Sequence, residues 1–136
     1  MDTKRLSISS GTAWESKVGY SRAVRVGHVI EVAGTTAVHG DEIIGKGNLY
    51  AQTKFIFEKI ERALKEAGGS LNDVVRTRMF VTDIKRWEEA GKAHGEFFKV
   101  IRPASTMVEV SSLIHPDLLI EVEVTAILID CLKVSP

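Results

Sequence analysis

The segment 118–130 alternates apolar and other side chains from Ile120 onward, and this alternation constrains the fold more than any other feature of the chain. Successive side chains of a strand point to opposite faces of its sheet. One face of this strand is therefore apolar, with Val122, Val124, Ala126 and Leu128, and the opposite face carries Glu121, Glu123, Thr125 and Ile127. The pattern predicts a strand whose apolar face packs on a core.

Other segments predict more strands and two helices. The alternation recurs at 74–81 and 105–110, while the β-branched runs 18–26 and 28–33 flank Gly27 as in a tight hairpin. Apolar residues return at helical spacing after Asn48, a good N-cap, until Gly68, and again after Asp83 until Pro103. The segment 35–48 is rich in glycine and is interpreted as a loop. Two amphipathic helices are expected to cover the apolar face of the sheet.

The second face of the predicted sheet is mixed. The residues assigned to it are Glu31, Arg76, Arg78, Phe80, Ser105, Met107, Glu109, Glu121, Glu123, Ile127 and Ile129, with Thr106, Val108 and Val110 on the core side. Such a face could simply be solvated, as in many antiparallel sheets. Its apolar members favour the alternative that other copies of the chain cover it.

Length and charge exclude several classes of protein. The chain has 136 residues, enough for one domain over 1–136, and 18 basic against 18 acidic residues, so no basic excess attracts nucleic acid or anionic lipid. No apolar run approaches the roughly 20 residues of a spanning helix. The single cysteine, Cys131, cannot form an internal disulfide and fits a reducing compartment. We expect a cytoplasmic protein without membrane or nucleic-acid partners.

Familiar catalytic motifs are missing from the sequence. The four histidines have no metal-ligand spacing, and the glycines near Gly45 lack the Lys-Ser/Thr of a phosphate loop. No Gly-x-Ser-x-Gly elbow of a serine hydrolase is present. We therefore expect neither a metal site nor a cofactor.

Segments spread over the chain carry a resemblance to a known family. They are 19–27, 32–34, 67–83, 102–110 and 120–123, in this order and with few gaps. Together they resemble the RidA/YjgF family of reactive-intermediate (enamine/imine) deaminases, some of whose members are labelled L-PSP endoribonucleases. The resemblance implies an α+β fold of the chorismate-mutase-like (YjgF) type, with a mixed sheet of about six strands and two helices on one face. It also implies a homotrimer with ligand clefts between neighbouring subunits.

The resemblance also implies a site. In deaminating members an arginine directly after a Pro-Ala pair binds the substrate carboxylate, a glutamate of the last strand positions a water, and a tyrosine of the early Gly-Tyr segment completes the cleft. Glu121 and Tyr20 match the glutamate and the tyrosine, but Ser105 stands at the arginine position. A serine cannot form a charged bidentate clamp, so the deaminase reaction does not carry over directly.

Several residues are candidates for the rest of the site. Arg76, Arg78 or Arg102 could supply the missing positive charge; alternatively Arg76 and Arg78 pair with Glu109 or Glu123, and Arg102 is solvated. Glu121 could equally pair with Arg76 or Arg78 at a subunit interface. The His94 side chain is interpreted as packed on the apolar face of its helix, with acid–base chemistry as the alternative. The further residues expected near a ligand are Ala33, Gly34, Ser105, Thr106 and Met107.

Three functions remain as hypotheses. The first is a cofactor-free enamine/imine deaminase, a hydrolase in which Glu121 activates water and Tyr20 shapes the pocket. The second is a non-catalytic trimer that binds small carboxylate metabolites in the same cleft. The third is RNA cleavage, for which the chain offers no stripe of basic and aromatic residues.

Overall fold

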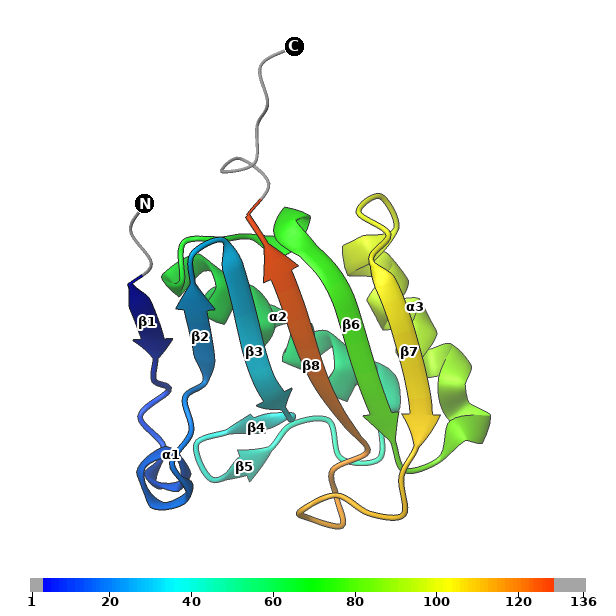
Figure 1. Cartoon of the computed structure of the whole chain (residues 1–136). Coiled ribbons are helices and arrows are strands. Elements are labelled where there is room, and N and C mark those ends of the chain that lie inside the picture. Colours follow the sequence, from blue (N-terminus) through cyan, green and yellow to red (C-terminus); the bar gives the residue numbers. More distant parts are fainter. Residues whose placement is uncertain (1–3, 129–136) are drawn as a thin grey trace.

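The computed structural model describes residues 4–128, which form one six-stranded sheet with helices on one of its faces (Figure 1). The strand order is β1 (Arg5–Ile8), β2 (Ala23–Val26), β3 (Val29–Thr35), β8 (Ile120–Ile127), β6 (Val74–Val81) and β7 (Ala104–Glu109). Neighbouring strands are antiparallel except β6 and β7, which are parallel. The predicted mixed α+β sheet is confirmed.

Two long helices, α2 (Leu49–Glu66) and α3 (Trp87–Phe98), lie side by side behind the sheet (Figure 1). Helix α2 begins at the predicted cap, where the Asn48 side chain accepts a hydrogen bond of 2.9 Å from the Ala51 amide. It ends before Gly68, whose positive φ of 90° suits glycine. The shorter elements are α1 (Ala13–Val18), β4 (Val38–His39), β5 (Glu42–Ile43) and the 3₁₀ turns η1 (Leu71–Asp73) and η2 (Ile84–Arg86).

The core lies between the two helices and the sheet. Ile120, Val122, Val124 and Ala126 of β8 are fully buried, as their alternation predicts, and they pack with Ile56, Phe57, Ile60 and Phe98 of the helices. In the described part of the chain, α2 and α3 both lie on this one side and no helix covers the other face of the sheet (Figure 1). It holds Glu121, Glu123 and Arg78, so the predicted division of β8 and most of β6 into two faces is correct.

The prediction for β7 was wrong in its orientation. Ser105 pairs with the buried Thr77 and lies on the helix side, whereas Thr106 pairs with Arg78 and lies on the open side. Met107 accordingly packs against the core, and Val108 is 42% exposed. This strand is at the edge of the sheet and, before Glu109, consists of small, hydroxyl and apolar residues, so its parallel register with β6, rather than its hydrophobic pattern, decides which side faces the helices.

Other local predictions also differ. Val18 ends helix α1 instead of starting a strand, and β1 pairs with β2 where no strand was expected. The expected loop 35–48 contains the small hairpin β4–β5. A register shift beside Val75 leaves this residue 37% exposed although it was assigned to the core side. Ile129, Asp130 and Cys131 fall outside the described residues, and within 4–128 no helix is long and apolar enough to cross a membrane.

Candidate functional site

Glu121 lies at the start of β8, against the main chain of Gly34 in β3. The pairing of the two strands shifts register between Val32 and Thr35, so Gly34 sits in an irregular stretch beside the carboxylate. A Cβ atom added at Gly34 would lie 3.0 Å from Cδ of Glu121 and still nearer to Oε2. Glycine at this position therefore makes the room in which the Glu121 carboxylate rests.

The environment of Glu121 favours its neutral form. Burial raises the pKa of this carboxyl; the positive charge of Arg22 lowers it, and the negative charge of Glu123 raises it. Within residues 4–128 Glu121 has no ion pair, and its pairing with Arg76 or Arg78 at a subunit interface stays a prediction. A half-buried carboxyl with a raised pKa and no bound cation is suited to take up and release a proton.

Tyr20 and Arg22 belong to the same neighbourhood as Glu121. Arg22 donates a hydrogen bond of 2.6 Å from Nη2 to the carbonyl oxygen of Gly34, the residue against which Glu121 rests. Its guanidinium carbon lies 6.0 Å from the centre of the Tyr20 ring. The structure thus places Tyr20, Gly34 and Glu121 around Arg22, which was not among the predicted site residues. Its position two residues after Tyr20 was the only signal that could have indicated it.

The predicted arginines of the open face have partners of their own. Arg76 donates a hydrogen bond of 2.6 Å to the hydroxyl of Thr106, and Arg78 lies 3.6 Å from Glu123 in an ion pair. The interpretation of Arg78 as an ion-pair residue is confirmed. Arg102 is exposed and stands just before β7 with a positive φ of 55°. None of these three guanidiniums has Glu121 as an ion-pair partner.

Ser105 and His94 lie in a separate polar chain on the helix side of the sheet. The Thr77 hydroxyl is 2.8 Å from the Ser105 hydroxyl and 2.9 Å from Nε2 of His94. The His94 ring also packs on Phe57 and Phe98, and burial lowers its pKa. The predicted packing of His94 on the apolar face of its helix is confirmed. Ser105 lies on the helix side of the sheet, whereas Glu121 lies on the open face.

Ser105 and Glu121 of one chain are too far apart to touch one small ligand. Glu121 pairs with Phe80, whereas Ser105, two strands away, pairs with Thr77. Three residues along a strand and two strand spacings put their main chains about 14 Å apart. Their side chains also point to opposite faces. Ala33, by contrast, directly precedes Gly34 and is part of the Glu121 neighbourhood.

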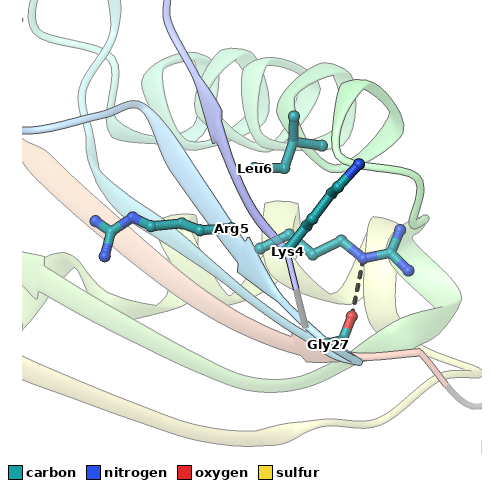
Figure 2. Close-up of a pocket in the computed structure, with 5 residues that line it drawn as sticks. Lys4, Arg5, Leu6 and Gly27 are labelled. Atoms are coloured by element: carbon teal, nitrogen blue, oxygen red, sulfur yellow. Dashed lines mark hydrogen bonds between the residues drawn. The ribbon is translucent and has the colours of Figure 1, made fainter. Parts of the chain in front are cut away.

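Two surface depressions lie outside this neighbourhood. One of about 380 Å³ is lined by Lys4, Arg5, Leu6, Arg25 and Gly27, and Figure 2 shows the hydrogen bond of 3.0 Å that Arg25 donates to the carbonyl of Gly27. It lies at the end of β1 and β2 opposite to Gly34. The other, of about 350 Å³, includes Asp41, Lys46, His115 and Asp117. Over the described part of the chain, no group of three or more potential ligands could hold a metal ion.

The sequence matches a protein family over almost all of the described residues. The profile of the family described as Endoribonuclease L-PSP, which is the RidA/YjgF family, matches residues 10–128. The chain belongs to this family. The predicted family is therefore confirmed, and with it the RidA/YjgF type of fold.

Three relatives show how close the similarity is. A crystal structure of a YjgF/YER057c/UK114 family member from Mycobacterium tuberculosis is 51% identical, with a TM-score of 0.82 over 92% of this chain and 100% of that chain. An uncharacterised protein of Streptomyces coelicolor is 39% identical over 119 residues, which are 88% of this chain and 89% of the relative. The 3-aminoacrylate deaminase RutC of Acinetobacter baylyi is 32% identical over 104 residues, 76% of this chain and 82% of that one.

Proposed function

We propose that this RidA/YjgF protein is a cofactor-free deaminase that hydrolyses small enamines or imines, with Glu121 as the acid–base group. The observation that carries the proposal is the position of Glu121, half-buried against Gly34 and unpaired, with its pKa raised by burial. The RutC relative, named a 3-aminoacrylate deaminase, supports the same class of substrate.

The chemistry requires one water and one proton relay. An enamine first takes up a proton at carbon to become an iminium ion. Water then attacks the iminium carbon, and the Glu121 carboxylate accepts the proton that the water loses. The carboxyl next gives this proton to the nitrogen of the tetrahedral intermediate, and the C–N bond breaks as the hydroxyl oxygen forms the carbonyl. The hydroxyl proton passes through the Glu121 carboxylate to the departing ammonia, so a carbonyl compound and ammonium leave. We assign the phenol of Tyr20 to the wall of the same cleft, close to the reacting atoms.

We propose further that the open face of the sheet is covered by sister chains in a homotrimer. Val29, Val75 and Val108 are 40%, 37% and 42% exposed in the single chain. Polar groups nearby are already paired within the chain, for example Thr125 with Glu31 at 2.6 Å and Arg78 with Glu123. Pre-paired charges lower the desolvation cost of covering such a face. Sedimentation or light scattering is expected to give the mass of three chains, and a stable monomer would contradict this proposal.

The experiment for the activity uses imines made in situ from amino acids by an amino-acid oxidase, with release of ammonia followed in time. Wild-type protein is expected to accelerate the release, and Glu121→Gln to return it to the uncatalysed rate. Lys65→Gln, which removes an exposed charge on helix α2, away from the open face of the sheet, is the control and should keep the wild-type rate. If wild type and Glu121→Gln are equally slow while a small carboxylate still binds, the protein is a non-catalytic metabolite binder.

A further inference from the structure

We infer that Arg22 binds the anionic group of the ligand, in place of the side chain that Ser105 cannot supply. This inference rests on the proposed function, because it names the charge class of the molecule that enters the Glu121 cleft. The ligand is expected to be a small molecule with a single carboxylate next to its reactive carbon–nitrogen bond.

The main chain of Arg22 is fixed on both sides. Its amide donates a hydrogen bond of 2.8 Å to Ile8, and its carbonyl accepts one of 3.0 Å from Ala33. These bonds continue the ladders of β1–β2 and β2–β3 beyond the assigned ends of the strands. Arg22 is therefore held by the sheet rather than by a flexible loop, as a group that must present a charge at a fixed place should be.

The guanidinium of Arg22 is poorly satisfied by the chain itself. Nη2 donates to the Gly34 carbonyl, while Nε is buried and has no hydrogen-bond partner among residues 4–128. No carboxylate lies within ion-pair distance of Arg22 in residues 4–128. A buried, unpaired donor on a cation is costly. A ligand cannot reach the buried Nε, but an anion at Nη1 would pair the charge of the guanidinium, so the site favours a negatively charged ligand.

The surrounding charges add to this preference. Lys59 donates hydrogen bonds to the carbonyls of Thr36 and Val38, just beyond the end of β3. Burial, and after it the positive charges of Arg22 and Arg62, lower the pKa of Lys59 from 10.5 to about 8. Against these cations stands Glu121, whose own ionisation is disfavoured by burial. Neither Arg22 nor Lys59 has a carboxylate within ion-pair distance in residues 4–128.

The other arginines are less suited to this role. Arg76 and Arg78 are engaged with Thr106 and Glu123. Arg22, in contrast, donates a hydrogen bond to the carbonyl of Gly34, and its positive charge lowers the pKa of Glu121. A carboxylate bound at Arg22 would place the adjacent carbon–nitrogen bond near Glu121, and the Tyr20 ring would flank it.

The test compares a carboxylate with its neutral counterpart. The probes are 2-oxobutanoate and 2-oxobutanamide, and their binding to the full chain is measured by calorimetry and by the ¹⁵N–¹H resonance of the Arg22 Nε group. We expect Arg22→Gln to weaken 2-oxobutanoate binding by about 10- to 100-fold, the range for losing a charged hydrogen bond. Binding of the amide should change by less than about threefold, and Lys65→Gln, at an exposed position of helix α2, should leave both affinities unchanged.

The outcomes separate this inference from the proposed function. If ammonia release depends on Glu121 but Arg22→Gln binds 2-oxobutanoate like wild type, the deaminase proposal stands and the role of Arg22 is overturned. If the carboxylate shifts the Arg22 resonance and no imine is hydrolysed, the role of Arg22 stands and the deaminase proposal fails. Arg22→Lys serves if Arg22→Gln does not fold, and it should keep part of the preference for the carboxylate over the amide; an equal affinity for both probes in wild type overturns the inference.

Discussion

Substituting Gly34 by alanine is expected to inactivate the protein without unfolding it. The main chain at Gly34 is not among the positive-φ positions, so alanine fits the local backbone. The new methyl group would lie 3.0 Å from Cδ and 3.3 Å from Cγ of Glu121, closer than the 3.5–4.0 Å or so of ordinary carbon contacts. The carboxylate is the free end of a flexible side chain, and it would have to move by roughly 1 Å, a displacement that can cost about 10²-fold in rate.

The same geometry gives the expected stability. Replacing glycine by alanine at a compatible position stabilises a protein by about 0.4–1 kcal/mol through the unfolded chain, and here this gain is offset by the displaced side chain. We therefore expect the free energy of unfolding in urea to change by less than about 1 kcal/mol. Gly95→Ala is the matched control: a Cβ there meets nothing within 4 Å, so helix α3 should gain up to about 1 kcal/mol with an unchanged rate.

The assay is ammonia release from imines formed in situ, measured for Gly34→Ala, Glu121→Gln and the double variant. Because both changes act through one carboxylate, the double variant should be no slower than Glu121→Gln alone. A folded Gly34→Ala protein with the wild-type rate would show that the position of Glu121 against Gly34 is not used. A double variant slowed by the product of the two single effects would show that Gly34 acts by some other route.

Three further predictions concern stability and pH. Arg102 has a positive φ of 55°, so Arg102→Gly should raise the free energy of unfolding by about 1 kcal/mol in urea melts. Burial lowers the pKa of His94 from 6.5, so the unfolded chain binds more protons and stability should fall as the pH drops below 6.5; His94→Gln should weaken this dependence. Burial and the charge of Arg22 lower the pKa of Lys59 from 10.5 to about 8, so stability should rise between these pH values, by about 1–2 kcal/mol after allowing for solvent screening, and Lys59→Met should abolish the rise.

The fold could be predicted where periodicity and capping agree. Strand β8 alternates apolar and polar residues along its centre, and its buried residues are those of the pattern. Asn48 caps α2 as expected because its short side chain can reach the Ala51 amide. The orientation of an edge strand was harder to predict. In β7 both faces offer small or hydroxyl side chains, and only pairing with β6, which lies far away in the sequence, sets the orientation.

Some residues of the candidate site could be predicted from the sequence and others could not. Glu121 and Tyr20 could be predicted because the sequence around them matches a family, and the structure brings both into the surroundings of Arg22 and Gly34. Arg22 could not be predicted, because an arginine before a strand is common in sequences. Only the structure shows that a carbonyl, an aromatic ring and a carboxyl surround it. The open-face arginines looked equally suitable in the sequence, and only their contacts with Thr106 and Glu123 distinguish them.

The separation of Ser105 from Glu121 leads to a prediction about assembly. If both residues line one cleft, they must come from different chains, because within one chain they are two strands apart and on opposite faces. Ser105→Trp, a bulky change at an exposed edge position, and Glu121→Gln should then each inactivate the homo-oligomer. In mixed oligomers refolded from equal amounts of the two variants, about one cleft in four would combine an intact Ser105 from one chain with an intact Glu121 from its neighbour. Recovery of about a quarter of the wild-type rate is therefore expected, whereas no recovery, or full activity of Ser105→Trp alone, would place Ser105 outside the cleft.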